Sequence, residues 1–342
     1  MKNNKKQFRV GIIGAGNIGN KRALAITELG RDIVTGVFDV NLENARKIAT
    51  NTNVKIFSTW QEMIKDPLID VIIVATPTDV NVKIVAEALK NGKDVLAEKP
   101  LGKSSHEAKK IFGLTKKYKR VLKVGFNHRH HPALFKAYEL VKSGAIGKVF
   151  YLRAVYGHGA RPGYDTEWRM QKKYSVGGEL FDQGVHVIDL ANWFIGGFTK
   201  AFGITRNYYW KKSNLEDNAF CELTNKKGQV ATFHSSLTQW KNKFSFEIFG
   251  SLGYLVINGL GKSYGKETLV LGTEVGFGKV PKEQIFDFEE KDISWREEWK
   301  EFRNSILEKR EPLANAKENL EVNKILEALY RSARSGKIIQ IK

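Results

Sequence analysis

Short apolar runs alternate with amphipathic segments over about the first third of the chain. Six runs are nearly continuous in apolar residues, as is typical of strands buried on both faces of a parallel sheet. They span residues 8–13, 33–38, 55–57, 70–75, 95–97 and 121–126. Between them apolar residues recur at helical spacing, as in residues 79–91, where Gly92 follows as a C-cap. This alternation predicts a doubly wound α/β domain with a parallel sheet over residues 1–126.

The pattern changes after Phe126. Several segments alternate apolar and polar positions and are joined by short turns rich in Gly and Asn, which predicts a mostly antiparallel sheet. These segments are residues 148–157, 201–210, 217–223, 229–235, 244–249 and 253–257. Helical spacing returns at 132–143, and again after residue 294, where a Trp/Phe stripe favours a buried structural helix. We therefore expect a second, α+β domain with this mostly antiparallel sheet at residues 127–342, whose C-terminal helix packs back on the first domain.

Composition limits the classes of protein. The 342 residues carry a formal net charge of +19, but the basic excess is spread along the chain and no nucleic-acid recognition motif occurs. No run approaches the roughly 18 apolar residues of a membrane-spanning helix. The single cysteine, Cys221, excludes an intramolecular disulfide and fits a reducing compartment. We expect a cytoplasmic protein with neither a nucleic-acid nor a membrane partner. Its charge favours a solvated, lysine-rich surface, and attraction of anionic ligands such as dinucleotides and nucleotide sugars is the alternative.

The first strand runs directly into a glycine-rich turn, Gly-Ala-Gly-Asn-Ile-Gly, and then into a helix. In this pattern the glycines permit a tight turn, close approach of a pyrophosphate and close packing of helix on strand. An acidic residue ends the second strand 20 residues later, at the distance expected for a carboxylate that binds the ribose 2′-hydroxyl. This acid favours NAD, with NADP as the alternative cofactor. The expected dinucleotide contacts here are Gly14, Gly16, Asn17, Ile18, Gly19 and Asp39.

A charged pair and a proline end the fifth strand, in the stretch Val-Leu-Ala-Glu-Lys-Pro at residues 95–100. In open α/β sheets ligands collect at the carboxyl ends of strands, so Lys99 is expected to face the cofactor crevice. The fourth strand ends nearby in the sheet at Thr76 and Pro77. We expect these two residues, Glu98 and Lys99 to contact the cofactor.

Four motifs together resemble those of the Gfo/Idh/MocA family of NAD(P)-dependent sugar and polyol oxidoreductases. They are Ala-Thr-Pro-Thr at 75–78, Gly-Lys-Asp at 92–94, Ala-Glu-Lys-Pro at 97–100 and Val-Gly-Phe-Asn at 124–127. The chain departs from the family at Asn81, where members usually carry a histidine. The resemblance implies a Rossmann domain followed by one open sheet with helices on one face and a subunit contact on the other. It therefore implies a homodimer or homotetramer formed through the open sheet face.

A second constellation begins at the glycine pair Gly177-Gly178 and runs into a helix. Asp182 and His186 are four residues apart, so α-helical spacing places them on one face. Oxidation of a secondary alcohol needs a base for the hydroxyl proton, and imidazole has a suitable intrinsic pKa. The family resemblance assigns proton transfer to His186, and it assigns to Asp182 the holding or orienting of the substrate. Asp189 lies about one helical turn further along and could orient His186. The alternative is that Asp182 and His186 only bond each other within a packed helix.

The reaction also needs a cation beside the developing alkoxide, and Lys99 is the candidate. We expect its ammonium and the His186 imidazole to converge beside the nicotinamide C4, around a single carbinol. Lys99, Asp182 and His186 are thus the predicted catalytic residues.

Groups that suit a sugar follow the strand 148–157. Tyr and Trp can stack on carbohydrate faces, and Arg can bind a phosphate or carboxylate with two bonds. Together with Asp182, the expected substrate contacts are Asn127, Arg161, Tyr164, Trp168 and Arg169. An exposed loop that only orders a dimer is the alternative interpretation of this segment.

His128, His130 and His131 form a histidine-rich segment at the strand exit. No acid or cysteine lies nearby at ligand spacing, so we expect a polar rim over the crevice and no bound metal.

The preferred hypothesis is oxidation of a ring hydroxyl on a sugar that is nucleotide-activated or acidic. A non-catalytic NAD-binding regulator and an inositol or dihydrodiol-type dehydrogenase are the alternatives.

Overall fold

The computed structural model describes residues 6–50, 54–276, 278, 280–288 and 291–342. The chain forms two compact units, one from residues 1–126 with 295–320 and the other from residues 127–294 with 321–342. The chain thus leaves the first unit at Phe126, where the sequence predicts a domain boundary, and residues 295–320 belong to the first unit again.

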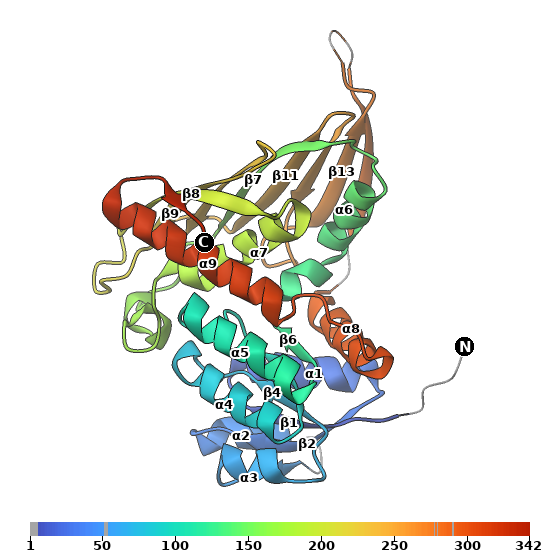
Figure 1. The fold of residues 1–342 in the computed structure, drawn as a ribbon, viewed down its shortest axis with the longest axis vertical. Coiled ribbons are helices and arrows are strands. Elements are labelled where there is room, and N and C mark those ends of the chain that lie inside the picture. Colours follow the sequence, from blue (N-terminus) through green and yellow to red (C-terminus); the bar gives the residue numbers. More distant parts are fainter. Residues whose placement is uncertain (1–5, 51–53, 277, 279, 289–290) are drawn as a thin grey trace. The chain divides into compact units, whose positions relative to one another are not determined.

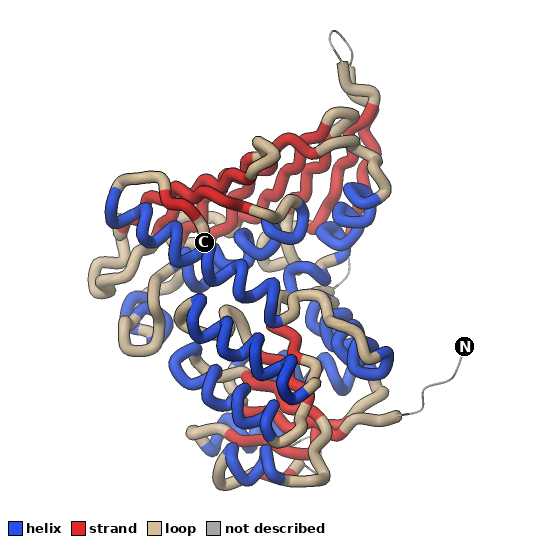
Figure 2. Tube along the Cα trace, in the orientation of Figure 1, coloured by secondary structure: helices blue, strands red, loops and turns tan. Residues whose placement is uncertain are grey.

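The first unit contains a six-stranded parallel sheet (Figures 1 and 2). Its strands are β1 (Arg9–Ile13), β2 (Ile33–Phe38), β3 (Lys55–Ile56), β4 (Val71–Val74), β5 (Asp94–Ala97) and β6 (Leu122–Val124). Its helices are α1 (Asn17–Leu29), α2 (Leu42–Ala49), α3 (Trp60–Lys65), α4 (Thr78–Lys90) and α5 (Ser105–Tyr118), with most of α8 (Ser294–Glu308). The strand order 3-2-1-4-5-6 is that of the Rossmann fold, and β4 is buried at every position, as its apolar run predicts.

The second unit contains a nine-stranded sheet in the order β14-β13-β12-β11-β7-β10-β9-β8-β15, in which only β7 and β10 pair in parallel. The strands are β7 (Val149–Gly157), β8 (Phe198–Arg206), β9 (Asn218–Asn225), β10 (Val230–Ser236), β11 (Lys243–Gly250), β12 (Tyr254–Asn258), β13 (Glu267–Thr273), β14 (Lys282–Phe288) and β15 (Ile339–Gln340). Helices α6 (Pro132–Lys142) and α7 (Val185–Phe194) pack on this sheet (Figure 1). Helix α9 (Ala316–Ser335) begins in the first unit and continues in the second. The predicted fold class, a Rossmann sheet plus an open, mostly antiparallel sheet, is confirmed.

Two details of the predicted strands were wrong. The strand expected at residues 201–210 ends at Arg206, because the carboxylate of Asp217 accepts hydrogen bonds from the backbone N–H groups of Tyr208, Tyr209 and Trp210 and turns the chain out of the sheet. The sequence analysis also missed β13 and β14, which lengthen the sheet beyond β12.

Candidate functional site

The glycine turn has the geometry that a dinucleotide needs. Gly14 has φ +94°, and a Cβ there would lie 2.4 Å from the carbonyl oxygen of Ala75. A Cβ on Gly19 would lie 2.0 Å from the oxygen of Gly14, so neither position tolerates a side chain without movement of backbone. Gly16 differs, because nothing lies within 4 Å of its added Cβ. The backbone at Gly16 therefore borders open space, as close approach of a pyrophosphate requires.

Helix α1 starts at Asn17 and Ile18, and no side chain caps it. Its first N–H groups and the positive end of its dipole are consequently suited to an anion. Asp39, which follows β2, lies at the same turn: its Oδ2 accepts from the N–H of Ala15 at 2.6 Å. The predicted acid therefore lies directly beside the glycine turn.

Thr76 and Pro77 follow β4, and Pro77 is the N-cap residue of α4. The hydroxyl of Thr76 is buried and has no hydrogen-bond partner within the described part of the chain. A buried hydroxyl of this kind needs an explanation, and a polar cofactor atom would supply its partner. The residues at this edge of the sheet therefore fit a bound dinucleotide.

Glu98 has a partner that the sequence analysis did not identify. Its Oε1 accepts hydrogen bonds from Nε and Nη2 of Arg22 at 2.9 and 2.6 Å, and the other side of the guanidinium binds Glu298 on α8. The Arg22 side chain is 1% exposed and that of Glu298 is 0% exposed. Burial raises the pKa of Glu298, and Arg22 opposes that effect. We call Glu98, Arg22 and Glu298 the buried ion triad.

The motif residue Gly125 borders this triad. A Cβ on Gly125 would lie 2.6 Å from Nη2 of Arg22 and 3.1 Å from both carboxylate oxygens of Glu98. The glycine of the Val-Gly-Phe-Asn motif thus leaves room for the guanidinium. The triad holds the carboxylate of Glu98, whose neighbour in the chain is Lys99.

Lys99 is half-buried and follows β5 at the carboxyl end of the sheet, as predicted. Asn81, the position that departs from the family pattern, is buried and donates from Nδ2 to the carbonyl oxygen of Pro100 at 3.3 Å. Asn81 therefore has a structural contact with the residue after Lys99.

In the second unit, His186 lies on α7 with its ring stacked on His128, the centroids 3.8 Å apart and the planes 17° apart. Tyr156 meets the edge of His128 at 5.3 Å, and Tyr264 lies 5.0 Å from Tyr156. Burial raises the pKa of Tyr264 to about 12, so this phenol stays protonated at neutral pH. The two stacked imidazoles and the two phenols form a cluster of groups that can donate to or accept from a hydroxylated ligand.

Asp182 belongs to a second group of side chains. It accepts from Nη1 of Arg169 at 3.3 Å and from the hydroxyl of Tyr164 at 3.4 Å. Burial also raises the pKa of Tyr164. Residues 180–184 form a π-helical turn before α7, so the α-helical spacing assumed between Asp182 and His186 does not hold over this stretch. Of the predicted substrate residues, Asp182, Tyr164 and Arg169 do come together.

Other predicted residues have different surroundings. Arg161 forms an ion pair with Glu167 at 2.5 Å and is 65% exposed, and Trp168 is 44% exposed. Asn127 is buried and donates to the hydroxyl of Ser294 at 2.9 Å. The carboxylate of Asp189, suggested to orient His186, accepts two hydrogen bonds from the buried guanidinium of Arg129, at 2.8 and 2.6 Å.

The histidine-rich segment has no metal-binding geometry. His131 contacts Glu267 through Nδ1 at 3.1 Å, while His128 stacks on His186. Among the described residues no group of three or more His, Cys, Asp or Glu could hold a metal ion. Likewise, none of the helices in the described ranges is long and apolar enough to cross a membrane.

Sequence reasoning treated His128 as part of a polar rim and missed Tyr156, Tyr264 and Arg22. The histidine run was the one available signal for His128. Tyr156 lies near the end of β7, Tyr264 lies in a turn and Arg22 lies in an ordinary helical pattern, so nothing local marks them.

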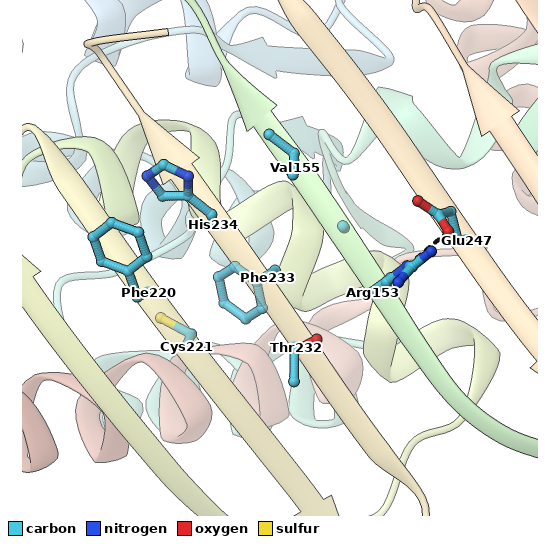
Figure 3. A pocket seen from close by; sticks show the side chains of 9 residues that line it. Arg153, Val155, Phe220, Cys221, Thr232, Phe233, His234 and Glu247 are labelled. Carbon is cyan, nitrogen blue, oxygen red and sulfur yellow. Dashed lines mark hydrogen bonds and ion pairs between the residues drawn. The ribbon is translucent and has the colours of Figure 1, made fainter.

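The second sheet also has a hollow of about 420 Å³ on β7, β9, β10 and β11 (Figure 3). Figure 3 shows the ion pair between Arg153 and Glu247 at one side, and Phe220 stacked on His234 at the other. Cys221 also lines the hollow, and burial raises its thiol pKa well above the usual value, so it is not a reactive thiolate.

Comparison with known proteins defines the class first: the chain is an NAD-dependent oxidoreductase. Residues 8–126 match the family model described as oxidoreductase family, NAD-binding Rossmann fold, and residues 135–256 match the GFO/IDH/MocA C-terminal domain. The chain belongs to the Gfo/Idh/MocA family, as its motifs predicted. Its cofactor is NAD, and the family to which it belongs comprises dehydrogenases that act on sugar and polyol alcohols.

Curated relatives include levoglucosan dehydrogenase from Pseudarthrobacter phenanthrenivorans, 27% identical over 74% of each chain. Another is dTDP-3,4-didehydro-2,6-dideoxy-alpha-D-glucose 3-reductase from Saccharopolyspora spinosa, 25% identical over 74% of this chain and 75% of that protein. A solved structure of levoglucosan dehydrogenase with NADH and levoglucosan matches with a TM-score of 0.89 and 22% identity, over 98% of this chain and 100% of the other. At that identity, the match shows that the fold is shared.

Proposed function

We propose that this protein oxidises a ring secondary alcohol of a sugar to a ketone, and that the sugar is nucleotide-activated or acidic. The observation that carries the proposal is the pair of stacked imidazoles of His186 and His128, in the unit that also brings Asp182, Arg169 and Tyr164 together. An imidazole held in a fixed orientation beside hydrogen-bonding phenols suits transfer of a hydroxyl proton. The carboxylate, guanidinium and phenol suit recognition of sugar hydroxyls or of an acidic substituent.

In the proposed reaction His186 takes the hydroxyl proton, and Lys99 stabilises the negative charge that develops on the alcohol oxygen. NAD⁺, which the glycine turn and Asp39 would hold, would supply the acceptor for the hydride of the carbinol carbon. Asp182 orients the substrate, and the products are a keto sugar, NADH and a proton. In the reverse direction the same residues return the proton to the carbonyl oxygen.

Replacement of the two central groups tests this mechanism. Lys99→Ala and His186→Ala should each lower kcat by about 10²–10⁴-fold, since that is the usual contribution of a positioned acid–base group, while NAD⁺ binding persists. His106→Ala is the matched control, because His106 is exposed on α5 in the first unit. Turnover at the wild-type rate in both alanine variants would refute the assigned roles. Cofactor binding without turnover on any substrate would favour a non-catalytic regulator.

The substrate class is tested by NADH formation with UDP-sugars, free sugars and inositols. Activity confined to inositols would overturn the assignment to sugars. The curated relative that is named as a reductase of a dTDP-sugar supports the inclusion of nucleotide sugars.

We also propose a homodimer or homotetramer formed through the open face of the second sheet, where the hollow of Figure 3 lies. Phe220 is 40% exposed there, so Phe220→Asp should lower the mass measured by light scattering. An unchanged mass would exclude this face as the contact. A cytoplasmic location suits a chain with a single cysteine.

A further inference from the structure

Three loops of the second unit share a small hydrophobic core of their own. They follow β7, β8 and β10, and we call them the three loops: residues 158–175, 207–217 and 237–242. The buried residues in that core are Tyr164, Met170, Trp210, Leu215 and Leu237. Because one of these, Tyr164, also contacts Asp182, the loop core adjoins the proposed substrate site.

Hydrogen bonds join the loops to each other. The indole N–H of Trp210 donates to the carbonyl oxygen of Leu237 at 2.9 Å. The hydroxyl of Ser213 donates to the carbonyl oxygen of Met170 at 2.7 Å, and the N–H of Lys212 donates to Asp165 at 3.1 Å. The three loops therefore form one assembly rather than separate surface segments.

The middle loop is held in a fixed conformation. Asp217 is buried and accepts hydrogen bonds from three successive N–H groups, those of Tyr208, Tyr209 and Trp210, at 2.7–3.0 Å. Asn207 donates from Nδ2 to three carbonyl oxygens of the same loop. These contacts use the backbone and leave the side chains of Tyr208 and Tyr209 in solvent.

Two large aromatic rings meet on the outside of this assembly. Tyr209 is 58% exposed and Trp240 is 66% exposed, and their rings meet edge to face with centroids 5.0 Å apart. We call this pair the distal platform. Exposed Trp and Tyr on a rigid support are typical of recognition surfaces, because their rings can bury further apolar area against a ligand.

The distal platform is connected to the substrate loop. A Cβ on Gly159 would lie 3.3 Å from the Trp240 ring, so the indole packs closely against the backbone there. The next residue back, His158, meets the ring of Tyr164 at 5.9 Å, and Tyr164 donates to Asp182. A chain of contacts thus runs from Trp240 to the carboxylate proposed to orient the sugar.

The exposed charge around the platform is positive. Lys211 and Lys212 follow Tyr209 and Trp210 in the chain, Lys241 follows Trp240, and all three are exposed. The acids of the three loops are buried or paired: Asp165 and Asp217 accept backbone N–H groups, Glu167 pairs with Arg161, and Glu216 accepts from Tyr330. A ligand for this surface should therefore combine a flat ring with negative charge.

We propose that the distal platform binds the base of a nucleoside diphosphate sugar, and that Lys211, Lys212 and Lys241 contact its diphosphate. This inference rests on the proposed function, since it assigns the part of the substrate that does not react. Stacking of a base on an aromatic side chain and charge attraction of phosphate by lysine are both general modes of nucleotide binding.

The test compares two ligands and three variants. Binding of UDP and GDP is followed by titration calorimetry in the wild type, in Trp240→Ala, in Tyr209→Ala and in the control Phe150→Ala, an exposed aromatic on β7 outside the three loops. We expect Trp240→Ala to weaken nucleotide binding at least about tenfold, in line with the loss of one stacked base, and Phe150→Ala to leave it unchanged. With a nucleotide sugar, KM should rise by the same factor and kcat should stay constant, because the lost contact is remote from the reacting carbon.

The outcomes separate this inference from the proposed function. Oxidation of acidic free sugars with no binding of UDP or GDP at millimolar concentration would overturn the inference and leave the proposed function intact. Nucleotide binding that is lost in Trp240→Ala would support the distal platform as the nucleotide site. If the wild type at the same time turned over no sugar, that result would count against the proposed function. A lower mass in Trp240→Ala by light scattering, with nucleotide binding unchanged, would make the platform a contact between copies of this chain and overturn the inference.

Discussion

The buried ion triad makes the stability of the first unit sensitive to one residue. Arg22→Met removes the guanidinium and leaves Glu298, which is 0% exposed, without its partner, while Glu98 keeps some contact with solvent. Removal of one partner from a buried ion pair costs about 3–5 kcal/mol. For a unit of about 150 residues, that loss corresponds to a melting temperature lower by roughly 6–20 °C.

The ionisation of Glu298 decides how the stability loss of Arg22→Met changes with pH. Burial already raises the pKa of Glu298 with Arg22 present, and loss of the cation should raise that pKa further. A carboxyl group whose pKa is higher in the folded state than in the unfolded state destabilises the fold as pH rises above the unfolded value, near 4.3. The loss of unfolding free energy in Arg22→Met should therefore be largest at pH 7–8 and should become smaller as the pH falls toward 5.

Urea unfolding followed by tryptophan fluorescence measures this effect. The double variant Arg22→Met, Glu298→Met is the control, because replacing both partners by apolar side chains removes the unpaired charge and should recover most of the loss. The reasoning is refuted if the single variant loses less than about 1 kcal/mol, or if its deficit is the same at pH 5 and pH 8.

Three further results are expected. Gly16→Ala should weaken NAD⁺ binding but keep the wild-type melting temperature, since its Cβ meets nothing within 4 Å. Gly19→Ala should also unfold at a lower temperature, because its Cβ meets the carbonyl oxygen of Gly14, and equal melting temperatures of the two variants by calorimetry would contradict this contrast. Asp39→Ser should reduce the ratio of kcat/KM for NAD⁺ over NADP⁺, because an acid at this turn repels a 2′-phosphate, and an unchanged ratio would mean that Asp39 does not face the ribose. Asp217→Asn should lower the free energy of unfolding by about 1.5–3 kcal/mol at pH 7, measured by urea unfolding. Burial raises the pKa of Asp217, but hydrogen bonds from Asn218 and three backbone amides outweigh burial and lower that pKa overall, so the loss should fade below pH 4. A loss that is constant with pH would show that the charge is not responsible.

Local patterns were enough to predict the first sheet. A run such as Val71–Val74 is apolar at every position, and only a strand covered on both faces needs that composition. The glycine turn was equally predictable, because the conflicts at Gly14 and Gly19 involve residues close in sequence or at the adjacent strand end.

Contacts between distant residues were not predictable in the same way. The side chain of Asp217 ends β8 by accepting hydrogen bonds from N–H groups seven to nine residues earlier. Hydrophobic periodicity does not predict such bonds. The helical pattern does not mark Arg22 as buried, since its partner Glu298 is 276 residues away. The stacking of His128 on His186 likewise joins two segments that no spacing rule relates.

The return of residues 295–320 to the first unit has a consequence for synthesis of the chain. A ribosome releases Arg22 and Asp32 early, but Glu298, Trp299 and Arg303, which bind them, emerge only after the whole of the second sheet except β15. Until then Asp32 lacks its cation, Arg303, and Arg22 has only one of its two carboxylates, Glu98. Completion of the first unit is thus a late event during translation, and a fragment ending at residue 126 lacks the cation of Asp32 and the second carboxylate of Arg22.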